Sequence, residues 1–146
     1  MGTMCPCGVQ VNAFARRKKV RLNWCKSRIR GNLTYKADVC VTKLASSSLS
    51  LRFEDDDTPN RYNFLFTANK INNITCRRNG ENCVVTVKGT GKVGTTQYPF
   101  VAVFIDQGAS AEDDIVQSFV IKGFFEQLEA VSVAQGSIVA LGCQKV

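Results

Sequence analysis

Apolar and polar residues alternate with a period of two along much of this chain, and that spacing limits the folds open to it. The alternation is strict in "SSLSLRF" (residues 47–53) and clear in "VQVNAFAR" (residues 9–16). In an extended strand, a period of two places every second side chain on the same face. The pattern therefore predicts strands with one face on a core and the other in solvent.

Extended stretches of this kind recur about every 8 to 12 residues and are separated by Gly, Asn and Asp. Besides the two above, they cover residues 20–24, 28–37, 38–44, 61–71, 83–93, 97–106, 115–125 and 136–143. Residues 16–19 are predicted to form a hairpin turn and residues 54–60 an acidic turn. Only residues 124–134 have helical character, and they are short and β-branched. The sequence predicts one all-β domain over residues 1–146, an antiparallel β-sandwich of Ig-like or jelly-roll-like type with about eight to ten strands.

The glycine-rich stretch "KGTGKVG" (residues 88–94) raises the question of a phosphate-binding loop. Gly89, Gly91 and Gly94 have the G-x-G-x-x-G spacing of such loops. A phosphate-binding loop leads into a helix, whose free N–H groups help to hold the anion. Here an apolar strand follows, so the glycines are predicted to form a tight turn or a bulge in a β-hairpin.

The chain has seven cysteines and no histidine. A zinc site usually draws on histidines or C-x₂-C pairs, so disulfides are favoured over a metal site or free buried thiols. Cys76 and Cys83 flank an Asn-Gly turn signal, and we predict a disulfide between them. Cys5 and Cys7 can tie down the N-terminal end, and the odd count leaves one cysteine over. Disulfides predict an extracellular location.

Several function classes are disfavoured by what the sequence lacks. Without histidine, Ser-His-Asp and Cys-His catalysis are excluded, and the acidic residues cluster in polar turns rather than apolar pockets. We therefore predict that the protein is not an enzyme. No apolar run approaches the roughly 18 residues that a membrane span requires, so we predict no membrane span.

Closely spaced acids offer one candidate metal site. Hard cations such as Ca²⁺ take several oxygen ligands, which acidic loops supply. The candidate ligands are Asp106, Asp113 and Asp114. A solvated turn without metal is the alternative, and no other cofactor is predicted.

The strongest charge feature is basic. The chain has a net charge of +7, and eight of its 19 Lys and Arg residues lie in residues 16–30, a stretch without acids. Such a cluster attracts polyanions, and a tryptophan within it can stack on a ring. The candidate polyanion-binding residues are Arg16, Arg17, Lys18, Lys19, Arg21, Trp24, Lys26, Arg28 and Arg30. The alternative is an edge strand whose charges deter aggregation.

Three segments, "GNLTY" (residues 31–35), "VVTVKGTGKV" (residues 84–93) and "YPFVAVFIDQG" (residues 98–108), carry a resemblance to a known kind of domain. They are similar to a small extracellular β-sandwich domain of secreted bacterial proteins, over residues 9–125. The resemblance implies a sandwich without catalysis, and the seven cysteines depart from it. A lesser similarity, to netrin-like and metalloproteinase-inhibitor domains, rests on the N-terminal C-x-C and on Cys143, and the other cysteine spacings do not follow it.

These observations favour a non-catalytic extracellular binding or structural module. Its basic face is predicted to contact an acidic glycan or an acidic protein surface. The alternatives are a nucleic-acid-binding structural protein, such as a small viral coat or fibre component, and a protease-inhibitor module. No motif for sequence-specific nucleic-acid recognition is present.

Overall fold

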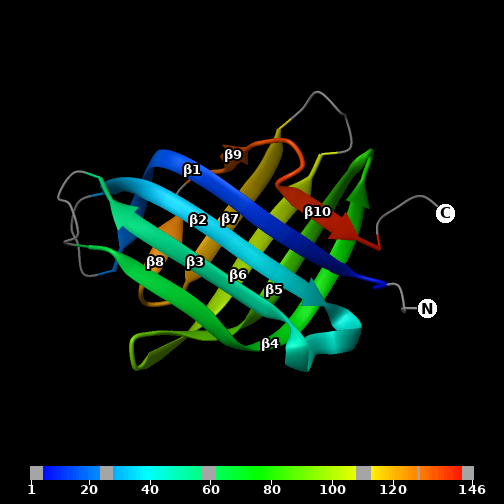
Figure 1. The fold of residues 1–146 in the computed structure, drawn as a ribbon, viewed down its shortest axis with the longest axis horizontal. Helices are drawn as coiled ribbons and strands as arrows, with labels where there is room; N and C mark the ends of the chain where they lie inside the picture. The colour runs from blue at the N-terminus through cyan, green and yellow to red at the C-terminus, as the bar shows by residue number, and fades with distance from the viewer. Residues whose placement is uncertain (1–4, 24–27, 57–61, 108–112, 128, 143–146) are drawn as a thin grey trace.

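One antiparallel sheet closes on itself into a barrel (Figure 1). The computed structural model describes residues 5–23, 28–56, 62–107, 113–127 and 129–142. The strands are β1 (Gly8–Leu22), β2 (Ile29–Cys40), β3 (Ser48–Asp55), β4 (Phe64–Asn79), β5 (Asn82–Val93), β6 (Thr96–Asp106), β7 (Asp114–Ile121), β8 (Phe125–Gln127), β9 (Val131–Val133) and β10 (Ile138–Leu141). The described residues include no helix with the length and apolarity that a membrane span requires.

Strand β1 closes the barrel because it pairs on both of its edges. One edge pairs with β2 along most of its length, and Val20–Leu22 on the other edge pair with β8. Near the start of β1, that second edge pairs with β10 instead, while β9 pairs with β7. The predicted β-sandwich is therefore wrong, although the all-β class is confirmed. Alternation with a period of two is the same in a sandwich and in a barrel, because both bury one face of each strand.

A β-bulge interrupts the pleat of β1. The register with β2 shifts between Ala15 and Lys18. Before the bulge the odd-numbered residues from Val9 to Ala15 face the core, and after it the even-numbered Val20 and Leu22 do. An extra residue in one strand produces this change of phase without ending the strand.

Several predicted turns and strand ends differ from those observed. Residues 16–19 are not a hairpin turn, because the interruption there is the bulge. Residues 28–37 and 38–44 are not two strands, since β2 runs unbroken to Cys40 and the 3₁₀ segment η1 (Val41–Ser46) follows it. A turn at Gly123 divides the predicted strand over residues 115–125 into β7 and β8.

The glycines of the stretch 88–94 serve two purposes. Gly94 has a φ of 62° in the turn between β5 and β6, which confirms the predicted hairpin. Gly91 lies within β5, and a Cβ atom there would stand 2.4 Å from a ring carbon of Phe66. At Gly89 a Cβ atom would stand 2.1 Å from the carbonyl oxygen of Lys70. Gly89 and Gly91 therefore let β5 approach β4 closely.

Aromatic rings fill the inside of the barrel, and Phe119 of β7 lies among them. Its ring centroid is 6.1 Å from that of Tyr35, 6.2 Å from those of Phe66 and Phe100, and 6.5 Å from that of Phe125. All five side chains are almost completely buried. A barrel of this size has an interior that side chains can fill, and these rings do so from β2, β4, β6, β7 and β8.

Two disulfides attach the N-terminal segment to the barrel. Cys5 bonds to Cys40 at the end of β2, and Cys7 bonds to Cys76 in β4. The predicted Cys76–Cys83 disulfide is therefore wrong, because the two residues are not opposite each other in the β4–β5 register and Cys76 bonds elsewhere. Cys83 is disulfide-bonded as well. Disulfides, rather than a metal site, are thus the state of the described cysteines.

We expect Phe119→Ala to lower the free energy of unfolding by about 3 to 5 kcal/mol, since it removes a ring that contacts four others. Phe14→Ala is the matched control, because that side chain is 48% exposed on the outside of β1. Denaturant unfolding of both variants measures the difference. A similar loss in the two would contradict this description of the core.

Candidate polyanion-binding site

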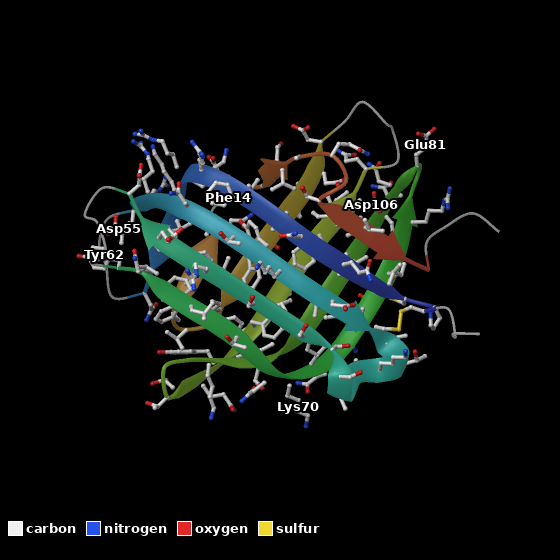
Figure 2. The ribbon with its side chains drawn as sticks, viewed as in Figure 1. Phe14, Asp55, Tyr62, Lys70, Glu81 and Asp106 are labelled. Atoms are coloured by element: carbon white, nitrogen blue, oxygen red, sulfur yellow. A yellow bond between two sulfur atoms is a disulfide. The ribbon has the colours of Figure 1, made fainter. Side chains whose placement is uncertain are left out.

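Five cationic side chains surround an open basin at one end of the barrel. They are Arg17, Lys18, Lys19, Arg28 and Arg30, with Glu129 beside them, and the basin has a volume of about 410 Å³. Figure 2 shows side-chain nitrogen atoms gathered at this end of β1 and β2, near the labelled Asp55. We call these six residues and the space between them the basic basin. The two disulfides Cys5–Cys40 and Cys7–Cys76 lie toward the other end of β1 and β2.

The bulge in β1 is what brings consecutive cations to the surface. Arg16 and Arg17 are both exposed, although neighbours in a regular strand point to opposite faces. Arg17 has a φ of 54°, in the left-handed region that costs a residue with a Cβ atom roughly 1–2 kcal/mol. Its backbone N–H donates a hydrogen bond of 3.1 Å to Oδ1 of Asn32 on β2, which helps to hold this conformation.

Like charges also face each other across the strands. Lys19 on β1 is directly opposite Arg30 on β2, and like charges in that position are destabilising. Among the described residues no carboxylate lies within 4.0 Å of Lys18, Lys19, Arg28 or Arg30. Within the described part of the chain, the basin therefore combines a strained backbone at Arg17 with four cations that have no carboxylate within 4.0 Å, and a bound anion would offset their charge.

A buried polar network holds Glu129 at the basin. The hydroxyl of Tyr35 donates to Oε1 of Gln127, and Nε2 of Gln127 donates to the carbonyl oxygens of Val116 and Glu129, at 2.8 and 2.9 Å. Burial raises the pKa of Tyr35 above its usual value, so the hydroxyl stays protonated and available as a donor. The backbone of Glu129 is thus connected to the core, and its side chain lines the basin.

Not all of the predicted polyanion-binding residues meet at this site. The guanidinium of Arg16 lies 5.8 Å from the ring centroid of Phe14, on the outer wall of β1. Arg21 is opposite Glu126, with 3.9 Å between its Nη1 and the carboxylate, and lines a separate groove. Trp24 and Lys26 lie outside the described residues.

The candidate calcium ligands have structural partners. Asp114 is fully buried, and its carboxylate accepts hydrogen bonds from the backbone N–H groups of Gln107, Gly136 and Ile138. Asp106 accepts one from Ala140, at 2.8 Å. The two acids therefore fasten β10 and the turn before it to β6 and β7.

These contacts give Asp106 and Asp114 structural roles, and calcium binding by Asp106, Asp113 and Asp114 stays a prediction. Asp113 is exposed. The described residues contain no group of three or more Asp, Glu, Cys or His side chains placed to hold a metal ion. Hydrogen bonding to the backbone accounts for Asp106 and Asp114 without a cation.

The carboxyl group of Asp106 has a raised pKa, chiefly because of burial, with a further contribution from the charge of Asp114; the hydrogen bond from Ala140 opposes the shift. A carboxyl whose pKa is higher in the folded state than the usual 3.8 opposes folding when it ionises. We expect Asp106→Asn to keep the acceptor and to increase stability at neutral pH. The gain should shrink as the pH falls through the folded pKa and vanish below 3.8. Urea unfolding from pH 3 to pH 7 tests this.

Asp114→Asn is the contrasting variant. Both carboxylate oxygens of Asp114 accept hydrogen bonds, and an amide offers only one acceptor. We expect a loss of about 1–3 kcal/mol at neutral pH, because a buried N–H loses its partner. Equal stability of Asp114→Asn and the unmodified protein would contradict the anchoring role.

No protein-family model, curated protein or solved structure matches this chain. The resemblance to a secreted bacterial domain stays a prediction, and the sandwich that it implied is not the fold observed.

Sequence reasoning missed two residues at the basin, Glu129 and Asp56. Nε of Arg17 lies 3.5 Å from a carboxylate oxygen of Asp56, the residue that follows β3. The sequence holds no local signal for either contact, because both residues are distant from the basic stretch in the chain. The sequence does carry one signal for the bulge: apolar residues recur at odd-numbered positions through Ala15 and at even-numbered positions from Val20. One extra residue within a single strand accounts for this shift as well as a turn between two strands does.

Proposed function

We propose that this protein is a non-catalytic extracellular binding module, and that its basic basin contacts an acidic glycan or an acidic protein surface. The observation that carries the proposal is the group of four cations, Lys18, Lys19, Arg28 and Arg30, around one open basin with no carboxylate within 4.0 Å among the described residues. A cluster of this kind binds polyanions by releasing their counterions.

Two further features support the proposal. Disulfides persist in oxidising compartments, and the bonds Cys5–Cys40 and Cys7–Cys76 agree with a protein that works outside the cell. A strained backbone persists where the surrounding structure fixes it, often at functional sites, and the one non-glycine residue with a positive φ in the described chain is Arg17 of the basin.

A nucleic-acid-binding structural protein is the second candidate. The exposed ring of Phe14, with the Arg16 guanidinium 5.8 Å from its centroid, is the kind of surface on which a base can stack. The acidic glycan is favoured because the disulfides point to an oxidising compartment. Parallel titrations with heparin and with single-stranded DNA separate the two, and only the second should weaken in Phe14→Ala.

We expect the protein to bind heparin with an affinity that falls steeply as salt is raised from low to physiological concentration. In Lys19→Gln and Arg30→Gln, the slope of log affinity against log salt should decrease by about 1 for each cation removed. Fluorescence titration with labelled heparin at several salt concentrations measures this.

Lys88→Gln and Lys92→Gln are the matched controls. Both residues are exposed on β5, four strands away from β1 around the barrel, and each variant changes the net charge equally. These variants should bind heparin nearly as the unmodified protein does. Equal effects of the β5 and basin variants would show that net charge, and not the basin, governs binding. If the protein ignores heparin, acidic proteins and nucleic acid at low salt, the proposal is wrong.

Arg17 allows backbone strain to be separated from charge. Arg17→Gly and Arg17→Ala both remove the guanidinium, but only glycine adopts the left-handed φ without a steric penalty. We expect the glycine variant to be more stable than the alanine variant by about 1 kcal/mol. Both should bind heparin more weakly than the unmodified protein and to the same extent. Equal stability of the two variants would mean that this residue is not strained.

A further inference from the structure

Asp56, which directly follows β3, lies beside the basic basin. Asp55 is opposite Gly31 in the β2–β3 register, and the backbone N–H of Asp56 donates a hydrogen bond of 3.0 Å to the carbonyl oxygen of Arg30. Strand pairing and this bond therefore fix the backbone of Asp56 beside the cations. The position of its carboxylate does not depend on the salt bridge alone.

Asp56 already supplies an anion to the basin. Its Oδ2 is 3.5 Å from Nε of Arg17, and the two side chains are 34% and 65% exposed. The guanidinium of Arg17 is thus oriented to receive an anionic oxygen at the edge of the basin. A carboxylate held so close has a high effective concentration for this position and competes with anions from solution.

We propose that Asp56 is an internal competitor at the basic basin, and that a bound polyanion replaces its carboxylate at Arg17. This inference rests on the proposed function, because it concerns how tightly the same basin binds its ligand. A polymer with many anionic groups gains from Lys18, Lys19, Arg28 and Arg30 together, so it can displace Asp56. A single small anion competes with the Asp56 carboxylate for Arg17 and makes fewer contacts with the other cations, so it binds more weakly than a polymer. Asp56 therefore lowers the affinity of the basin for anions, and it lowers it more for a small anion than for a polymer.

The test compares Asp56→Asn with Glu126→Gln in titrations with heparin at one fixed low salt concentration. Each variant removes one carboxylate from a salt bridge to an arginine of β1, and asparagine keeps the backbone N–H that bonds to Arg30. Since an exposed ion pair is worth about 0.2–1 kcal/mol, Asp56→Asn should raise heparin affinity roughly 1.4-fold to fivefold. Glu126→Gln, at a pair outside the basin, should raise it less.

A double-mutant cycle shows whether the effect acts through Arg17. In an Arg17→Gln background, Asp56→Asn should change heparin affinity little, because the contested guanidinium is gone. Asp56→Ser serves as a second variant, and thermal melting of each variant checks that the fold is intact.

The possible failures are distinguishable. No heparin binding by the unmodified protein would overturn the proposed function and this inference together. Binding that depends on Lys19 and Arg30 but is unchanged by Asp56→Asn and Asp56→Ser would leave the proposed function standing and overturn the inference. The inference would also be overturned if Glu126→Gln raised heparin affinity equally, or if Asp56→Asn raised it in the Arg17→Gln background. Either result would mean that the gain comes from the change in net charge and not from the contact with Arg17.

Discussion

The phase of the pleat in β1 is the constraint on which the rest of this structure depends. The strand presents odd-numbered side chains to the core up to Ala15 and even-numbered ones from Val20. If the pleat continued without the bulge, Arg17, Lys19 and Arg21 would face the aromatic interior. Burial of unpaired charge there would cost far more than the strain of one left-handed residue. The bulge avoids that burial, and it lets β1 continue to the point where it pairs with β8 and closes the barrel.

Closure of the barrel removes most of the sheet edges, and polar side chains hold the short strands β8 and β10 where they pair with β1. Asp106 and Asp114 accept backbone N–H groups from β10 and from the turn before it, and the Tyr35–Gln127 contact joins β2 to β8 inside the barrel. No buried side-chain nitrogen or oxygen of the described residues lacks a hydrogen-bond partner. Because an unsatisfied buried group is costly, these contacts favour one pairing of the short strands over others.

The basic basin is a product of the same bulge. The extra residue turns both Arg16 and Arg17 outward, and the β2 register then places Lys19 opposite Arg30. Backbone strain and like-charge repulsion thus occur together at one end of the barrel, whereas the buried polar side chains of the described residues all have hydrogen-bond partners. The salt bridge from Asp56 to Arg17 offsets part of this repulsion, and the proposed function assigns the remaining cations of the basin to a bound polyanion.

The sequence by itself determined the all-β class, the β3, β5 and β6 strands, the glycine turn at Gly94, the use of cysteines in disulfides and the concentration of cations in residues 16–30. Each follows from local information: side-chain period, turn residues or composition. Only the tertiary structure decided that the sheet closes, that Cys76 bonds to Cys7, and that Asp56 lies beside Arg17. These depend on which strands become neighbours. A period of two is equally compatible with a sandwich and a barrel, so the pairing of β1 with β8 had to be observed in three dimensions.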